Sequence, residues 1–347
     1  MKIVYSEAHR AHAGGMEFVN GGFVPMFEKP ERMDMVLAQI EAAGFGEMLE
    51  PQSFDLTAAE RVHDAGYLDF LQSAYRLYRE EVDSEESLDC ALPFAFGMRG
   101  MRQTPGESIH AKLGCYCFDL SVPFVEGTWS AIKASCDVAL TGAALMRDGA
   151  REAFSLCRPP GHHASRDLAG GYCYINNVAV AAQAALDAGA ARVAILDVDY
   201  HHGNGTQAIF YDRDDLLFVS LHGHPDQEYP YFAGYADETG AGRGEGHNLN
   251  LPMRWGTAWA DYGAALESGL ARIRDYSPDL LLVSLGVDTY KDDPISHFAL
   301  EHEDYLRIGA AIAGLRLPTL FVMEGGYAVA EIGVNVVNTL TGFEEAR

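Results

Sequence analysis

The sequence lacks the segments that direct a protein into a membrane or out of the cell. Its N-terminus has no basic segment followed by an apolar core, and no apolar run approaches the ~18 residues that cross a bilayer. Its six cysteines include no Cys-x-x-Cys pair, so neither a cysteine-bound zinc site nor a disulfide framework is expected. We therefore expect a cytoplasmic protein without membrane association.

Basic residues are also scarce. The chain has 25 Lys and Arg against 50 Asp and Glu, which gives a formal net charge of −25. Such a surface repels phosphate, so nucleic acid is not an expected partner. The charge favours a cationic ligand, but many soluble enzymes are acidic for solubility alone, and the support is mild.

No composition break, repeat, linker or low-complexity tract divides the chain, so residues 1–347 are expected to form a single domain. Helical stretches at Ala179–Ala188 and Trp259–Tyr276 alternate with short apolar runs that are typical of buried strands. This alternation predicts an α/β fold, with a central, mostly parallel sheet and helices on both of its faces.

The most informative stretch is Asp197-Val-Asp-Tyr-His-His202, which follows the apolar run Val193–Leu196. Alternate side chains of an extended segment share a face, so Asp199 and His201 can converge on one point. A carboxylate and an imidazole at one point suit a borderline divalent ion such as zinc. A lone Asp-x-His would more often be a hydrogen-bonded core pair than a pair of ligands.

Three further apolar runs are also followed by a glycine and reactive side chains. Four such segments in one chain argue against a purely structural explanation. The three runs are followed by Arg158-Pro-Pro-Gly-His-His163, Gly286-Val-Asp288 and Glu324-Gly-Gly-Tyr327. This is the form expected of a parallel sheet whose active site lies beyond the carboxyl ends of its strands. With Asp288, the chain has three candidate ligands and an open fourth position, as in catalytic zinc sites.

Proton transfer and oxyanion stabilisation have candidates in the same motifs. His162 and His163 are adjacent, and each can be tuned through the partner of its second ring nitrogen. A carboxylate such as Asp197 would keep one histidine charged, whereas the amide of Asn204 would leave the other nearer neutrality and suited to act as a base. Tyr327 can offer its phenol to a developing oxyanion. These groups together describe metal-assisted hydrolysis of an amide.

The motifs resemble those of the arginase–deacetylase superfamily and, within it, the histone-deacetylase-like enzymes. Six matching segments occur in the family's order: Arg158–Ala164, Gly170–Asn177, Asp197–Thr206, Ser220–His222, Leu285–Asp288 and Glu324–Tyr327. Three more point to the bacterial acetylpolyamine amidohydrolases: Tyr5–Pro25, Arg61–Tyr67 and Asp288–Ser296. The resemblance implies the arginase–deacetylase fold.

The resemblance also implies a role for each matched residue. One zinc ion would be bound by Asp199, His201 and Asp288. His163 would be the general base and acid, His162 with Asp197 an electrostatic partner, and Tyr327 the group that polarises the carbonyl. Asn204 replaces an aspartate seen in some histone deacetylases. Structural potassium would be bound at two sites, one formed by Asp197, Asp199, His201, Ser220 and Leu221 and the other by Phe210, Arg213 and Leu216.

Substrate contacts follow from the same comparison. Tyr172, Gly171 and Tyr229 match the wall of the family's acyl channel, and Glu17 matches a position near the substrate. The irregular, proline-punctuated segment from Leu88 to Gly127 corresponds to an insertion that builds a homodimer interface and narrows the active-site entrance. Glu107 and His110 lie in it, and His110 stands where the family pattern has an acid.

The expected function is zinc-dependent removal of acetyl groups from acetylated polyamines or similar small cationic amines. The main alternative is a protein or peptide lysine deacetylase, which shares every catalytic residue and differs in channel access. A binuclear manganese ureohydrolase would lack ligands, because Gly286 stands where a second aspartate is needed. A non-enzymatic binding protein would have lost a ligand or the tyrosine. Iron(II) or cobalt(II) also suits an Asp-His-Asp site.

Overall fold

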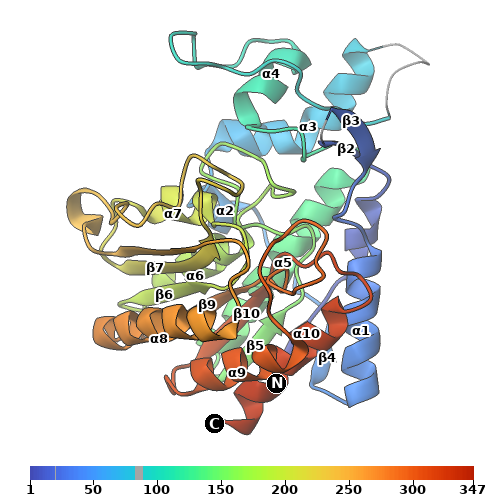
Figure 1. Cartoon of the computed structure of the whole chain (residues 1–347). Coiled ribbons are helices and arrows are strands. Elements are labelled where there is room, and N and C mark those ends of the chain that lie inside the picture. The colour runs from blue at the N-terminus through green and yellow to red at the C-terminus, as the bar shows by residue number, and fades with distance from the viewer. Residues whose placement is uncertain (20, 83–88) are drawn as a thin grey trace.

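In a computed structural model of the chain, which describes residues 1–19, 21–82 and 89–347, a sheet of eight parallel strands forms the centre (Figure 1). Every neighbouring pair in it is parallel. The order across the sheet is β4 (Glu47–Leu49), β1 (Lys2–Val4), β5 (Glu152–Ser155), β10 (Thr319–Met323), β9 (Leu280–Leu285), β6 (Val193–Asp197), β7 (Leu216–Gly223) and β8 (Asn248–Met253). The four strands that precede the sequence motifs are therefore neighbours.

Helices cover both faces of the sheet, as predicted. One core cluster joins the sheet to α2 (Thr57–Glu60), α3 (Ala65–Glu81), α4 (Ile109–Tyr116), α5 (Thr128–Arg147) and α6 (Asn177–Asp187). A second joins the other face to α1 (Glu31–Ala43), α8 (Trp259–Tyr276), α9 (His302–Ala313) and α10 (Ile332–Glu345). Along β6, Val193 and Ile195 belong to the first cluster, whereas Ala194 and Leu196 belong to the second. The continuous apolar run thus reflects burial on both faces.

The remaining elements are short. They are the two-stranded antiparallel hairpin of β2 (Met16–Val19) and β3 (Gly22–Pro25), the helix α7 (Asn204–Phe210), and the 3-10 turns η1 (Glu7–Ala11) and η2 (Gly242–Gly244). None of the helices in the described ranges is long and apolar enough to cross a membrane.

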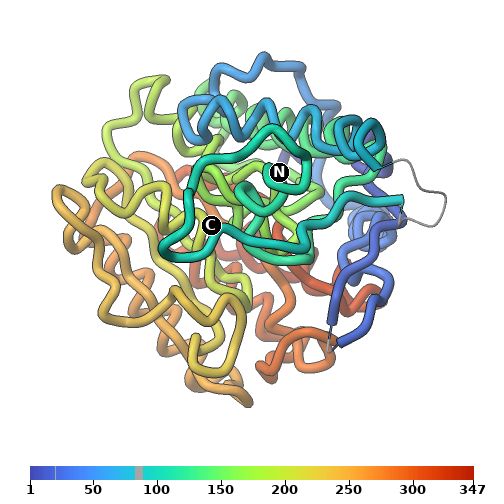
Figure 2. Tube along the Cα trace, turned by 90° about the horizontal axis from the view of Figure 1, so that it is seen from above, coloured from blue at the N-terminus to red at the C-terminus, as the bar shows by residue number. Residues whose placement is uncertain are grey.

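The segment predicted to be irregular contains one helix that the sequence analysis missed. Leu88 lies outside the described residues. Beyond it, Ser108 caps α4 by accepting a hydrogen bond from the N–H of His110, and Ile109 and Leu113 are buried one turn apart. Eight residues were too few to show a helical period. Seen from above, the segment crosses the top of the molecule (Figure 2).

A buried ionic cluster joins the start of α1 to the loop after β5. The Glu28 carboxylate oxygen Oε1 accepts hydrogen bonds from Arg32 (2.9 Å) and Arg158 (2.8 Å), and all three side chains are at most 1% exposed. Burial by itself raises the pKa of Glu28, but the charges of the two arginines outweigh it and lower the pKa to about 2. The carboxylate is therefore charged, and it compensates two buried cations.

We expect Glu28→Gln to lower the free energy of unfolding by about 3–5 kcal/mol, because it leaves buried guanidinium groups uncompensated. Chemical denaturation measures the loss. Glu7→Gln is the control, since Glu7 forms an exposed ion pair with Arg10, and its unfolding midpoint should hardly move. Equal midpoints for the two variants would show that the buried cluster does not stabilise the fold.

Candidate active site

Four loops meet at the carboxyl edge of the sheet because β5, β10, β9 and β6 are parallel neighbours. The loop after β6 carries Asp199 and His201, and the loop after β9 carries Asp288. The loops after β5 and β10 carry the histidine pair and Tyr327. This is the edge where open parallel sheets bind their ligands.

The three candidate metal ligands converge. One ligand atom from each of Asp199, His201 and Asp288 lies within 4.8 Å of the others, and all three residues are buried. His201 Nδ1 is 3.0 Å from Asp288 Oδ2 and 3.5 Å from Asp199 Oδ1. Backbone N–H groups of Gly325 and Tyr200 donate to the remaining carboxylate oxygens, Asp199 Oδ2 and Asp288 Oδ1, at 2.8 Å. These bonds orient the ligands as outer-shell partners do in metal sites.

Two glycines leave room for these carboxylates. A Cβ atom on Gly286 would lie 2.0 Å from Asp199 Oδ2, and one on Gly325 would lie 2.6 Å from the Oδ2 atoms of both Asp199 and Asp288. Any larger residue would displace a candidate ligand. The donor set of two carboxylates and one imidazole, with His201 facing a cavity, therefore fits a catalytic divalent ion with an open position.

The adjacent histidines have the different partners that their motifs predicted. His162 Nδ1 is 3.0 Å from Asp197 Oδ2, and His163 Nδ1 is 2.6 Å from Asn204 Oδ1. Burial alone lowers the pKa of His162, but the charges of Asp199 and Asp197 and the bond to Asp197 outweigh it and raise the pKa to about 10. Burial and the neighbouring charge of His162 lower the pKa of His163 well below its ordinary value. These surroundings favour the charged form of His162 and the neutral form of His163.

A cavity of about 390 Å³ opens above these groups. The cavity is lined by the candidate catalytic residues His163, His201 and Tyr327. Its lining also includes the residues predicted to form the wall, which are Glu17, Gly171, Tyr172 and Tyr229. Gly171 has φ +54°, and a Cβ there would lie 2.2 Å from the ring of His163, so only glycine lets the wall approach the histidine. Burial raises the pKa of Tyr327 well above its usual range, so the phenol keeps its proton.

The lining of this cavity, called the channel below, includes three carboxylates. Among the described residues, no Lys or Arg lines it. Glu17 accepts a hydrogen bond from the hydroxyl of Tyr172 (2.8 Å). Asp119 was not predicted; its Oδ2 accepts the N–H of Gly171 (2.9 Å) and the hydroxyl of Tyr229 (2.6 Å), joining two sides of the wall. Its only sequence signal was an acid among apolar residues, Cys117 to Leu120. Glu228, also not predicted, is the third carboxylate.

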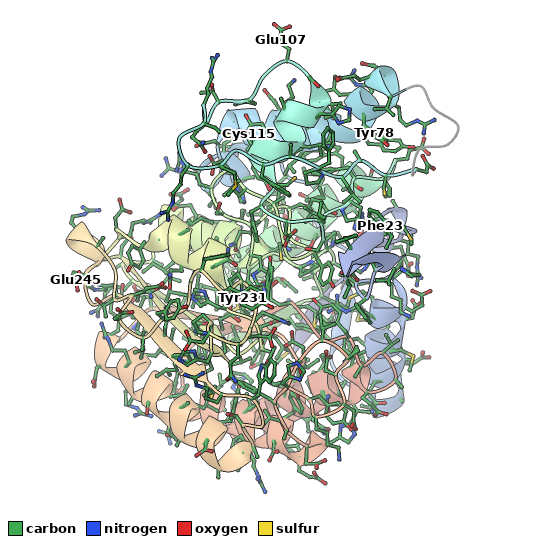
Figure 3. The ribbon with its side chains drawn as sticks, turned by 45° about the horizontal axis from the view of Figure 1, so that its top comes forward. Phe23, Tyr78, Glu107, Cys115, Tyr231 and Glu245 are labelled. Atoms are coloured by element: carbon green, nitrogen blue, oxygen red, sulfur yellow. The ribbon has the colours of Figure 1, made fainter. Side chains whose placement is uncertain are left out.

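Glu107 and His110 lie elsewhere in this chain. Figure 3 shows Glu107 at the outer tip of the segment 89–127, called the upper segment below, and far from Tyr231 at the channel. His110 lines a separate hollow of about 700 Å³ under that segment, and its ring packs against Phe94. This hollow is larger than the channel but contains none of the candidate catalytic groups. Neither residue lines the channel.

The residues predicted to bind potassium are partly adjacent. Asp197 of β6 pairs with Ser220 of β7 in the sheet register, and Leu221 follows Ser220. The N–H of Arg213 donates to the carbonyl of Phe210 (3.1 Å), and Leu216 begins β7. Asp199 and His201 of the first group lie in the loop after β6, beyond this strand pair.

Comparisons with known proteins agree with the geometry. Residues 26–343 match the histone deacetylase domain. The chain is 55% identical over 344 residues to acetylpolyamine amidohydrolase 2 of Pseudomonas aeruginosa and 46% identical over 342 residues to the acetylpolyamine amidohydrolase of Mycoplana ramosa, covering 99% of each chain in both cases. A crystal structure of the acetylpolyamine aminohydrolase from Burkholderia pseudomallei superimposes with a TM-score of 0.95 at 41% identity, covering 100% of this chain and 99% of that one. These findings confirm the resemblance drawn from the motifs: the chain belongs to the histone deacetylase family.

Proposed function

We propose that this chain is a zinc-dependent amidohydrolase that removes acetyl groups from acetylated polyamines or similar small acetylated amines. The observation that carries the proposal is the convergence of Asp199, His201 and Asp288 beneath a channel lined by His163, Tyr327 and carboxylates. The full-length similarity to relatives named acetylpolyamine amidohydrolase supports it.

Asp199, His201 and Asp288 would hold the zinc ion. When bound there, zinc supplies Lewis acidity that activates water and polarises the amide carbonyl. The family is metal-dependent, and iron(II) or cobalt(II) also suits this donor set. Potassium would be held at the group around Ser220, beside the loop that carries Asp199 and His201, and at the group around Phe210, between α7 and β7.

His163 has the tautomer that a general base needs. Asn204 Oδ1 is an acceptor, so the hydrogen bond at Nδ1 requires the proton of His163 to be there, and Nε2 keeps its lone pair. Nε2 can take a proton from the attacking water and later give it to the leaving amine. His162, held charged by Asp197, stabilises negative charge in the same site. Tyr327 donates its phenolic proton in a hydrogen bond to the carbonyl oxygen as that oxygen gains charge.

Substrate choice rests on the channel. Its volume of about 390 Å³ suits a slender chain, and Glu17, Asp119 and Glu228 provide negative charge for an ammonium group. A lysine deacetylase of proteins would share the floor of the site, so the entrance decides between the two activities. Phe94, Met98 and Met101 of the upper segment are 61–76% exposed, as an apolar face covered by a second subunit would be. We therefore propose a homodimer in which this segment narrows the entrance.

Removal of the metal with a chelator should abolish hydrolysis, and zinc should restore it. Asp288→Ala should weaken zinc binding by more than the roughly 10- to 100-fold that loss of an outer-shell partner costs, because among the described residues the group of ligands contains only Asp199, His201 and Asp288. Metal content after dialysis checks this, with Asp275→Ala on the exposed side of α8 as the control. Full zinc occupancy of Asp288→Ala would refute the ligand assignment.

The two histidines should differ in their effect on catalysis. We expect His163→Ala to lose about 10²- to 10⁴-fold in kcat while retaining zinc, as removal of a general base does. His162→Ala should lose less, and His110→Ala, outside the channel, should remain active. Turnover and bound metal are measured on the same samples. A nearly normal His163 variant beside an inert His162 variant would reverse the two roles.

The intact protein should elute as a dimer and prefer small cationic substrates. The ratio of kcat/KM values for N-acetylputrescine and an acetyl-lysine peptide measures the preference. Glu17→Gln should reduce kcat/KM for N-acetylputrescine more than for uncharged N-butylacetamide, because only the first carries an ammonium group. A monomer that deacetylates the peptide better than acetylpolyamines would favour the protein-deacetylase alternative.

A further inference from the structure

Two glycines give the backbone of the loop that carries Tyr327 more conformational freedom than other residues would. Tyr327 follows two glycines, and Gly326 has φ +128°, a conformation that other residues rarely adopt. A phenol that must meet an oxyanion needs a fixed position, because a displacement of about 1 Å can cost on the order of a hundredfold in rate. The position of the phenol therefore depends on contacts from outside the loop.

One external contact comes from Asp293, in the loop after β9. Its carboxylate oxygen Oδ2 accepts hydrogen bonds from the backbone N–H groups of Tyr327 (2.6 Å) and Ala328 (3.0 Å). Its other oxygen, Oδ1, accepts the N–H of Ile295 (3.1 Å), which fixes the carboxylate within its own loop. Asp293 is only 6% exposed, so water competes little for these bonds.

A second contact comes from Arg32, at the start of α1. Arg32 Nε donates to the carbonyl of Gly326 (2.7 Å) and Nη2 to the carbonyl of Glu324 (2.6 Å). Its guanidinium carbon lies 4.8 Å from the centre of the Tyr327 ring. The buried ion pair with Glu28 holds this side chain in place. Asp293 thus accepts hydrogen bonds from the N–H groups of Tyr327 and Ala328, whereas Arg32 donates hydrogen bonds to carbonyl groups that precede Tyr327 in the same loop.

We infer that Asp293 is a positioning residue for Tyr327, with Arg32 as a second group that holds the same loop. This inference rests on the proposed function, in which the phenol stabilises the oxyanion. Asp293 does not line the channel, so it acts on the reaction through the backbone of Tyr327 and Ala328. Its loss should leave zinc and substrate bound while the phenol is no longer held against the carbonyl oxygen.

A double-mutant cycle tests the coupling. Asp293→Asn removes the charge that two N–H groups share and should lower kcat about ten- to a hundredfold, with KM and zinc content nearly unchanged. Tyr327→Phe should lower kcat by about a hundredfold or more. In the Tyr327→Phe background, Asp293→Asn should cost less than about twofold, because the hydroxyl that it positions is absent. Equal factors in both backgrounds would show that Asp293 has only a structural role.

Hydrogen exchange of the peptide that contains Tyr327 and Ala328 gives a readout independent of activity. Both amides should exchange slowly in the wild-type protein and faster in Asp293→Asn. Asp292→Asn is the matched control. This substitution removes the same charge from an exposed neighbouring residue and leaves the hydrogen bonds of Asp293 to Tyr327 and Ala328 in place. Unchanged exchange in Asp293→Asn would overturn the inference. If exchange rises but Tyr327→Phe keeps normal kcat, the role of the tyrosine in the proposed function fails, and the inference about catalysis fails with it.

Discussion

The site depends on the buried carboxylate of Asp199, where three strand-end loops meet. It accepts the N–H of His201 in its own loop and the N–H of Gly325 in the loop after β10, and it fills the space that Gly286 leaves in the loop after β9. Glu324 makes the remaining link, since its Oε2 accepts the N–H groups of Gly161 and His162. Two buried carboxylates therefore tie together all four loops that carry candidate catalytic groups.

Buried negative charge on this scale is stable only if it is compensated. His162, held charged, lies against Asp197, and its Nε2 is 3.8 Å from Asp199 Oδ1. Burial and the charge of Asp199 raise the pKa of Asp288 to about 7. Without a cation, the protein therefore disfavours a negative charge on Asp288 in addition to those on Asp197 and Asp199. A divalent cation would remove that repulsion, which is the physical reason for associating this cluster with a metal.

The sequence was sufficient to predict the groups at the strand ends, because each lies within a few residues of an apolar run whose partner strands are parallel. Asp199, His201 and Asp288 come together for this reason, and the fold prediction is confirmed. Asp119 was missed because its contacts, Gly171 and Tyr229, lie 52 and 110 residues away along the chain. The Arg32 contacts span more than 290 residues. Such pairings follow from tertiary packing and leave no local pattern.

The channel carboxylates show how one catalytic floor can serve different substrates. Glu17 and Asp119 are already hydrogen-bonded to the hydroxyls of Tyr172 and Tyr229, so the same bonds that place the aromatic walls also fix the charges. A cation passing between these walls meets fixed negative charge without reorganising the protein, which keeps the cost of binding low. A neutral substrate gains nothing from the arrangement. In the proposed function, substrate preference would rest on these wall hydrogen bonds, and it could change while Asp199, His201 and Asp288 stay the same.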